Sequence, residues 1–184
     1  MDLKLIIIIV LVLACVLYFI LINNKLIKLS NEIKEAFSTM DVYLKKRWDL
    51  IPNVVEVVKG YAKHEEKTFT EVTKIRKSAY DKMTIEEKIN TNEELSNGIS
   101  RIMILAEKYP DLKASDNFKD LSSQLTKVED EIAQSRKYYN ATVRVFNNKV
   151  EMFPSNVVAK ILGYKRAKMF EINTEERENI KVEL

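Results

Sequence analysis

The first hydrophobic feature of the chain is an unbroken apolar run over residues 5–22, LIIIIVLVLACVLYFILI. A helix of this length covers the hydrocarbon core of a bilayer, and Lys4 and Lys25 flank it as interfacial anchors would. The run is longer than the apolar part of a cleaved signal peptide, and it continues past Cys15, which argues against a lipoprotein. The pattern predicts an uncleaved transmembrane helix at 5–22 after a short N-terminal flank at 1–4.

Basic residues are concentrated on the C-terminal side of this run. Lys4 is the only basic side chain before it. Those that follow are Lys25, Lys28, Lys34, Lys45, Lys46 and Arg47. Because positive charge is retained on the cytoplasmic side, we expect a single-pass protein of the cell membrane with its short N-terminus extracellular and its larger C-terminal part cytoplasmic.

Beyond the run, apolar residues recur at steps of three and four, as on one face of an amphipathic helix. Such stripes cover residues 26–44, 54–79, 95–109 and 118–153. Four helices with one apolar face each can bury those faces together. The expected fold is therefore all-α: a transmembrane helix, an antiparallel four-helix bundle over 26–153, and a short helix and tail over 154–184.

The stretch DLIP interrupts the first two stripes. Asp49 is a good N-cap, which would place Pro52 in the first turn of a new helix. The apolar register also permits a kinked continuous helix, but helix length favours the turn. Gly60 suggests close approach by a neighbouring helix, and Thr91 with Glu94 predicts a capping box.

Composition removes several classes of function. The formal charge is only +3, with 30 basic and 27 acidic residues interspersed, so no basic face for nucleic acid is expected. One histidine, His64, and one cysteine inside the apolar run cannot build an ordinary zinc or di-iron site. We therefore expect no cofactor and no enzymatic activity, and interpret His64 as structural. A hydrolase using His64 with Glu65 is the catalytic alternative.

A second constellation lies in YYNATVRVFNN, residues 138–148. Seven-residue spacing gives an aromatic ladder of Tyr139 and Phe146 beside an amide ladder of Asn140 and Asn147. We interpret these as core aromatics flanked by amides that set helix register. The alternative is a polar groove that receives a partner segment.

The basic cluster KKR at 45–47 is expected to be a solvated tip or a contact for a protein. The candidate partner-binding or structural residues are Arg47, Asp49, Pro52, Asn53, His64, Glu65, Arg136, Tyr139, Asn140 and Asn147.

Several blocks together resemble the LemA family: LKKRWDLIPNVVEVVKGYAKHE at 44–65, YPDLKAS at 109–115, YYNATVRVFNNKVEMFPSN at 138–156, and the ending MFEINTEERENIKVEL. Trp48 stands where family members usually carry a polar residue. The resemblance implies a single-pass bacterial membrane protein with an antiparallel four-helix domain and an extracellular N-terminus. The family has no established enzymatic activity that could be carried over to this chain. Family genes often lie near genes for membrane metalloproteases, which implies a role in envelope quality control and a membrane protease system as partner.

The leading hypothesis is a membrane-anchored helical scaffold or adaptor that binds protein partners. The alternative is a small-molecule or lipid sensor with a pocket between helices. A sensor or an enzyme is expected to show a concave pocket that contains His64.

Overall fold

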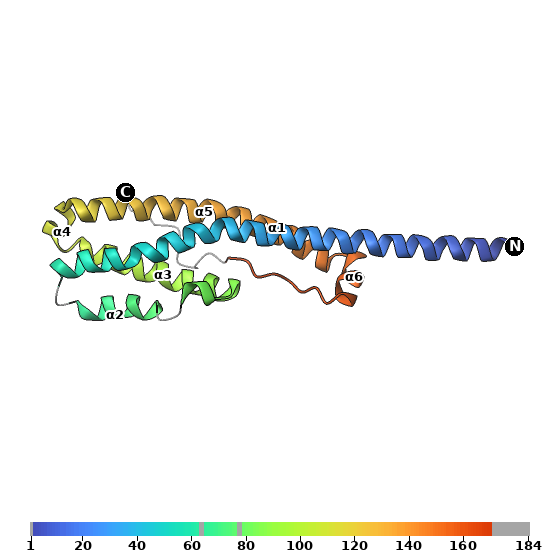
Figure 1. Ribbon diagram of the computed structural model, residues 1–184, viewed down its shortest axis with the longest axis horizontal. Coiled ribbons are helices and arrows are strands. Elements are labelled where there is room, and N and C mark those ends of the chain that lie inside the picture. The colour runs from blue at the N-terminus through green and yellow to red at the C-terminus, as the bar shows by residue number, and fades with distance from the viewer. Residues whose placement is uncertain (1, 63–64, 77–78, 171–184) are drawn as a thin grey trace, which may run out of the picture. The chain divides into compact units, whose positions relative to one another are not determined.

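The computed structural model describes residues 2–62, 65–76 and 79–170 (Figure 1). Within these ranges the chain is helical and contains no strand, as predicted. The elements are α1 (Leu3–Tyr61), α2 (Glu66–Ile75), a 3-10 turn η1 (Tyr80–Lys82), α3 (Ile85–Ala106), α4 (Pro110–Ala114), α5 (Asp116–Glu151) and α6 (Ser155–Ile161).

The chain forms two compact units. Unit 1 consists of Met1–Phe37 and Lys137–Met169, and unit 2 consists of Ser38–Arg136 and Phe170–Leu184. The two long helices α1 and α5 each contribute residues to both units.

The apolar run forms the first part of α1, which is the one helix in the described ranges long and apolar enough to cross a membrane. Its side chains are almost all exposed up to Leu21. Burial begins at Ile22 and recurs at Leu26, Leu29 and Ile33, which is the helical period. The helix therefore passes from an apolar run to an amphipathic stripe without a break.

The predicted turn at Pro52 is wrong, because α1 continues through Pro52 to Tyr61. A proline inside a helix costs about 3 kcal/mol. The helix nevertheless buries one uninterrupted face across it, with Trp48, Ile51 and Val54 at 5%, 1% and 2% exposure. Burial of each large apolar side chain contributes about 1.5–3 kcal/mol, so the packed face outweighs the missing hydrogen bond.

In unit 2, α2 packs against α3 through a glycine. A Cβ atom at Gly98 would lie 2.9 Å from Cγ2 of Val72 and 3.6 Å from Cδ1 of Ile75. A close approach was expected at Gly60, but a Cβ atom added there would have no contact within 4 Å among the described residues beyond its chain neighbours and the backbone of its own helix. The close approach therefore occurs at Gly98 instead.

The helix boundaries of unit 2 follow local capping chemistry. A capping box forms at Thr84 and Glu87, and not at the predicted Thr91 and Glu94, because α3 begins about two turns earlier than expected. The hydrogen bonds from the Thr84 backbone and hydroxyl hold the pKa of the Glu87 carboxyl below its usual value. Pro110 occupies the first turn of α4, where its missing N–H costs little.

Unit 1 ends in a turn and an extended segment. Helix α5 ends at Glu151, as predicted from Pro154, and α6 follows. The Phe153–Pro154 peptide bond is cis. Gly163 then adopts a φ of 75°, a left-handed conformation that favours glycine and ends the helix. Residues 164–169 run on without helical structure, and the tail from 171 lies outside the described residues.

Candidate functional site

The polar centre of unit 2 is the guanidinium of Arg47, which α1 carries on its buried face at 1% exposure. Nη1 donates to Oγ of Ser96 at 2.8 Å and to Oε1 of Glu129 at 2.7 Å. Nη2 donates to the carbonyl oxygen of Asn92 at 2.9 Å and also to its Oδ1. One side chain of α1 thus binds both α3 and α5.

The expectation that Arg47 is solvated is therefore wrong. Lys46 is exposed, and Lys45 forms an exposed ion pair with Asp49 at 2.7 Å, but Arg47 lies one step round the helix on the buried face. A buried charge must be paired and hydrogen-bonded to be tolerated, and four acceptors on two helices meet this requirement. Glu129 has 39% side-chain exposure, so the ion pair is open to water on one side.

A second polar cluster in unit 2 centres on Asp41. Oη of Tyr80 donates to its Oδ1 at 2.6 Å, and Nζ of Lys88 donates to its Oδ2 at 2.7 Å. Lys88 Nζ also lies 4.5 Å from the centroid of the Tyr80 ring. Burial, and then the hydrogen bond to the Asp41 carboxylate, raise the pKa of the Tyr80 hydroxyl, so Tyr80 stays protonated.

Trp48 belongs to the same neighbourhood. The ring centroids of Trp48 and Tyr80 lie 5.4 Å apart. The guanidinium carbon of Arg76 lies 5.2 Å from the centroid of the Trp48 ring. Trp48 is 5% exposed. Trp48 is therefore a large aromatic packing centre between α1 and η1.

The remaining candidates near the proline are not gathered into a site. Asp49 and Asn53 are exposed on α1, and Pro52 is half-buried. Glu65 precedes α2 and makes no side-chain cap hydrogen bond. His64 lies outside the described residues, so its predicted structural role remains a prediction.

In unit 1, the side chain of Asn147 forms hydrogen bonds with the backbone of the extended segment at residues 164–169. Its Nδ2 donates to the carbonyl of Ala167 at 3.0 Å, and its Oδ1 accepts from the Ala167 N–H at 2.8 Å. The Asn147 side chain is buried at 3% exposure. This paired contact satisfies both backbone groups of one residue in an extended chain, much as a neighbouring strand would.

Tyr139 forms a hydrogen bond with the same segment at the next residue, Lys168. Its Oη donates to the carbonyl of Lys168 at 3.0 Å, and its ring meets Phe37 of α1 with centroids 5.9 Å apart. Burial raises the pKa of the Tyr139 hydroxyl, which therefore remains a donor. Arg136 and Asn140 are half-buried, and Asn140 has an interaction of its own. Tyr139 and Asn147 thus both bind the backbone of the same segment of the chain, at Lys168 and Ala167.

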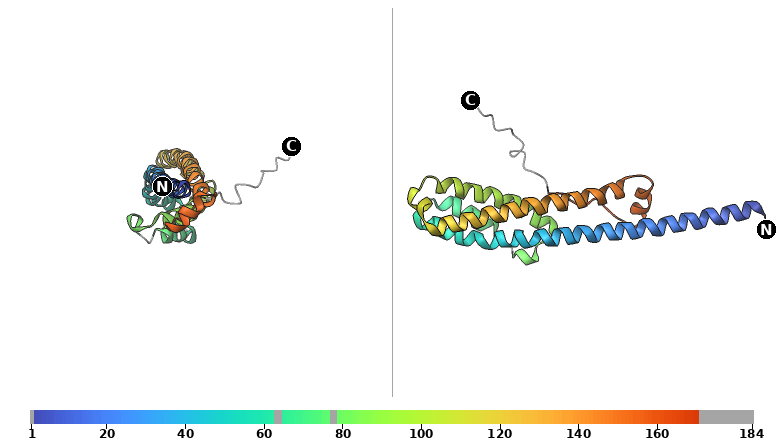
Figure 2. Two further views of the ribbon diagram at one scale, coloured as in Figure 1. Left: turned by 90° about the vertical axis from the view of Figure 1, so that its right-hand side faces the viewer. Right: turned by 90° about the horizontal axis from the view of Figure 1, so that it is seen from above.

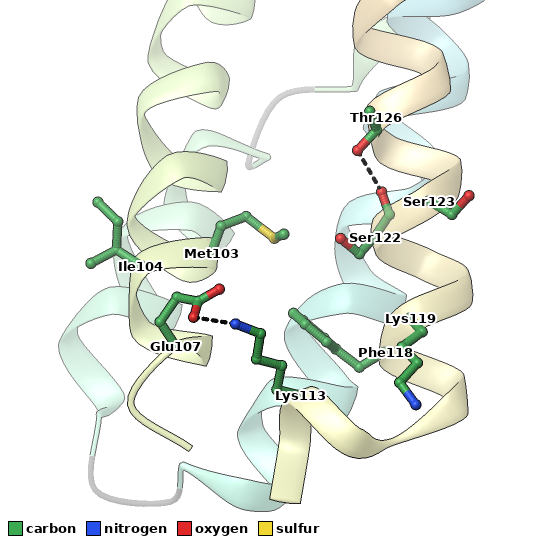
Figure 3. A pocket seen from close by; sticks show the side chains of 9 residues that line it. All are labelled: Met103, Ile104, Glu107, Lys113, Phe118, Lys119, Ser122, Ser123 and Thr126. Carbon is green, nitrogen blue, oxygen red and sulfur yellow. Dashed lines mark hydrogen bonds and ion pairs between the residues drawn. The ribbon is translucent and has the colours of Figure 1, made fainter. Parts of the chain in front are cut away.

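Unit 2 contains a hollow of about 650 Å³ between α3, α4 and α5 (Figure 3). Its lining residues are Met103, Ile104, Glu107, Lys113, Phe118, Lys119, Ser122, Ser123 and Thr126. An ion pair of 2.5 Å between Glu107 and Lys113 crosses its lower edge. Among the described residues no group of three or more His, Cys, Asp or Glu could hold a metal ion. The described polar clusters join helices through hydrogen bonds and are suited to positioning those helices, while Nε of Arg47 is buried without a hydrogen-bond partner in the described part of the chain.

Comparison with known proteins places these features in a family. The LemA family pattern matches residues 36–184. The chain belongs to the LemA family. One relative, protein LemA of Metamycoplasma hominis, is 26% identical over 169 residues, which is 90% of this chain and 77% of the relative. The family match over residues 36–184 includes the Arg47 centre and the Asn147 contact and begins after the apolar run.

Other relatives of this LemA-family chain are magnetosome proteins. MamQ 1 and MamQ 2 of Paramagnetospirillum magneticum are each 36% identical over 75 residues, 41% of this chain. MamQ of Magnetospirillum gryphiswaldense is 32% identical over 74 residues, 40% of this chain. The aligned part covers only 28% and 27% of these relatives' lengths.

The sequence did not identify the three residues that accept hydrogen bonds from Arg47, which are Asn92, Ser96 and Glu129. Asn92 lies three residues after Ile89 and three before Leu95, both buried. A polar side chain at an apolar-face position of a helix is a signal of a buried polar contact. That signal was present, but its partner is 45 residues away in the chain.

Proposed function

We propose that this protein is a membrane-anchored scaffold whose helical domain binds protein partners. The observation that carries the proposal is the exposure pattern of α1. Its apolar first part is exposed up to Leu21, and the same helix is buried in the domain from Ile22 onward. A long exposed apolar helix face requires a non-aqueous environment, so α1 is both the anchor and a structural helix of the domain.

We infer that the domain is an antiparallel four-helix bundle built in unit 2 from the C-terminal part of α1, α2, α3 and the N-terminal part of α5. Within unit 2, Arg47 joins α1 to α5 through Glu129, and the two helices run in opposite directions in Figure 1. The Arg47 contacts to α3 add a third helix, and α2 packs on α3 through Gly98.

The proposed topology is a single span over residues 5–22 with the short N-terminus extracellular and the bundle cytoplasmic. The excess of lysine and arginine after the span supports this orientation. A reporter enzyme that is active only outside the cytoplasm, fused after Leu184, should be inactive, and the same reporter fused before Met1 should be active. The opposite pattern would refute the orientation while leaving the anchor intact.

The partner class we propose is a membrane protein system that handles envelope quality control, with a membrane protease as the first to test. Photo-crosslinkers at the exposed positions Asn53, Lys59 and Arg144 in living cells, followed by mass spectrometry, should trap a recurrent protein. A crosslinker at the buried position Val58 is the matched control. Equal recovery from exposed and buried positions, or no recurrent protein, would refute the scaffold.

A second candidate is a small-molecule or lipid sensor, favoured by the hollow between α3, α4 and α5, whose lining differs from the His64 pocket expected of a sensor because His64 lies outside the described residues. Its volume of about 650 Å³ lies within the range of ligand sites. Ser122→Trp would fill the hollow from α5, since the Ser122 side chain points toward α3 in Figure 3. If sensing is the function, the variant should remain folded and lose the cellular phenotype that deletion of the gene produces. A normal phenotype would exclude this hollow as a sensor site.

A further inference from the structure

The turn between α5 and α6 carries an exposed apolar surface that the proposed scaffold role does not use. We define the corner patch as Met152, Phe153, Val157, Ile161 and Leu162. Phe153 is 81% exposed, the highest value among the large apolar side chains that the structure describes, and Met152 is 62% exposed. Val157 and Ile161, one turn apart on α6, are 51% and 68% exposed.

The corner patch is held in place by the opposite face of α6. Ser155, Val158 and Ala159 on that face are 3%, 4% and 0% exposed. Helix α6 is therefore packed into unit 1 on one side, with apolar residues also on its outward side. A surface helix normally has polar residues on its outward side, so α6 presents Val157 and Ile161 to an environment other than water.

Positive charge surrounds the corner patch. Lys160 is exposed on α6 beside Ile161, and Lys165 is exposed just after the helix. Arg166 is also exposed, and its Nε lies 3.2 Å from Oε1 of Glu151. An exposed apolar surface bordered by lysine is the composition of segments that lie at the boundary of headgroups and acyl chains in anionic membranes.

The position of the corner patch within unit 1 matches such a boundary. Phe37 of α1 contacts Tyr139 of α5, and the two helices run in opposite directions in Figure 1. Both rise about 1.5 Å per residue. Glu151, twelve residues after Tyr139, therefore lies level with Lys25, twelve residues before Phe37. The views in Figures 1 and 2 agree that α6 lies beside α1, while the N-terminal part of α1 extends beyond it. The apolar run ends at this level.

We propose that the corner patch inserts into the surface of the same bilayer that α1 crosses, with Lys160 and Lys165 against anionic headgroups. The proposal rests on the anchoring role of α1. A second copy of the chain is a poorer occupant, because a symmetric contact would bring the lysines of both copies together. A lipid surface supplies both the apolar environment and the negative charge.

The test uses the full chain, with Cys15→Ser as background, in nanodiscs that hold one copy each and contain anionic phosphatidylglycerol. Phe153→Cys carries an environment-sensitive fluorophore, and brominated lipids serve as quenchers. Val10→Cys labels the anchor, and Ile104→Cys, 65% exposed on α3, is the matched control away from the patch. The label at 153 should shift to the blue and lose emission to lipids brominated near the headgroups. The label at 104 should do neither.

Each other result has a distinct meaning. Quenching at 10 without quenching at 153 overturns the corner insertion and leaves the anchor. No quenching at 10 or 153 overturns both. A blue shift at 153 that needs several copies per disc shows self-association and overturns the lipid assignment. The charge is tested by Lys160→Glu with Lys165→Glu, which should reduce quenching at 153, against Lys46→Glu with Lys59→Glu, which should not. Equal quenching in both double variants overturns the headgroup contact.

Discussion

Removal of the Arg47 guanidinium tests whether the polar centre stabilises unit 2. In Arg47→Met the unbranched side chain retains much of the aliphatic volume of arginine. The four acceptors on Asn92, Ser96 and Glu129 lose their donor. The change therefore isolates the electrostatic contribution from the packing contribution more cleanly than a change to alanine.

The magnitude follows from the exposure of each partner. Deletion of one member of a buried ion pair costs about 3–5 kcal/mol, because the other charge stays buried and unpaired. Glu129 retains 39% side-chain exposure, so water can solvate its carboxylate after the loss. The two Asn92 acceptors are more deeply buried, and each unsatisfied group costs about 1–3 kcal/mol. We expect Arg47→Met to lower the free energy of unfolding by about 3 kcal/mol.

The assay is equilibrium unfolding of the full chain in detergent by guanidinium chloride, followed by far-ultraviolet circular dichroism. Glu129→Gln should cost about 1 kcal/mol, since its carboxylate is partly solvated. Arg47→Lys should fall between wild type and Arg47→Met, because one ammonium cannot contact both Asn92 and Glu129 as a planar guanidinium does. If Arg47→Met lies within about 0.5 kcal/mol of wild type, the magnitude expected of a surface substitution, the reasoning is refuted.

Three further predictions use the same full-length preparation. Asn147→Leu removes both hydrogen bonds to the extended segment, so trypsin should cut residues 164–169 faster, whereas Asn148→Leu at the exposed neighbouring position should leave the rate unchanged. The raised pKa of Tyr80 means that the folded state keeps a proton that the unfolded state releases near pH 10. The stabilisation of the folded state by protonated Tyr80 is present below that pH and is lost as the pH rises further. The denaturation midpoint of Tyr80→Phe should therefore fall less steeply above about pH 10 than that of the wild type. Thr84→Ala should lower the free energy of unfolding by about 0.5–2 kcal/mol as a lost cap, and Asp49→Ala by no more than about 0.5 kcal/mol as a lost surface pair; the reverse order would indicate a helix start at Asp49.

The sequence predicted best those elements whose signals are local. The apolar run, the stripe that became α5 and its end before Pro154 all depend on contiguous residues. The capping box was placed at Thr91, because both Thr91 and Thr84 precede a glutamate by three residues. Which threonine caps a helix depends on where that helix begins, and η1 and the start of α3 depend on packing of Tyr80 against α1.

The errors at Pro52 and Gly60 have a tertiary origin. Local propensity disfavours proline inside a helix, but the free energy of a buried face depends on the helices that cover it. Gly60 has an open Cβ position, while Gly98 has a neighbour at 2.9 Å. Only the pairing of α2 with α3 distinguishes the two glycines.

The site was only half predictable for the same reason. Tyr139 and Asn147 were singled out because each belongs to a ladder of seven-residue spacing, Tyr139 with Phe146 and Asn140 with Asn147. The segment that they bind was not predicted, because nothing local marks residues 164–169 as an extended segment that packs against α5. Arg47 was singled out as part of a basic cluster and assigned to a solvated tip or a protein contact. Its burial depends on four acceptors on three residues of helices α3 and α5, and such long-range pairings leave no periodic signal in the sequence.

The absence of a linker after the apolar run has a consequence for how the membrane segment and the domain face their surroundings. Leu21 is 58% exposed and Ile22, the next residue, is 7% exposed. Successive residues of an α-helix are rotated by about 100° about the helix axis. Because the helix is continuous, the rotational orientation of the apolar run is fixed relative to the buried stripe. One residue inserted between Ile22 and Leu26 would swing the span by about 100° about its own axis. Any neighbour that contacts one side of the apolar run therefore also fixes the rotation, about the helix axis, of the buried stripe that begins at Ile22.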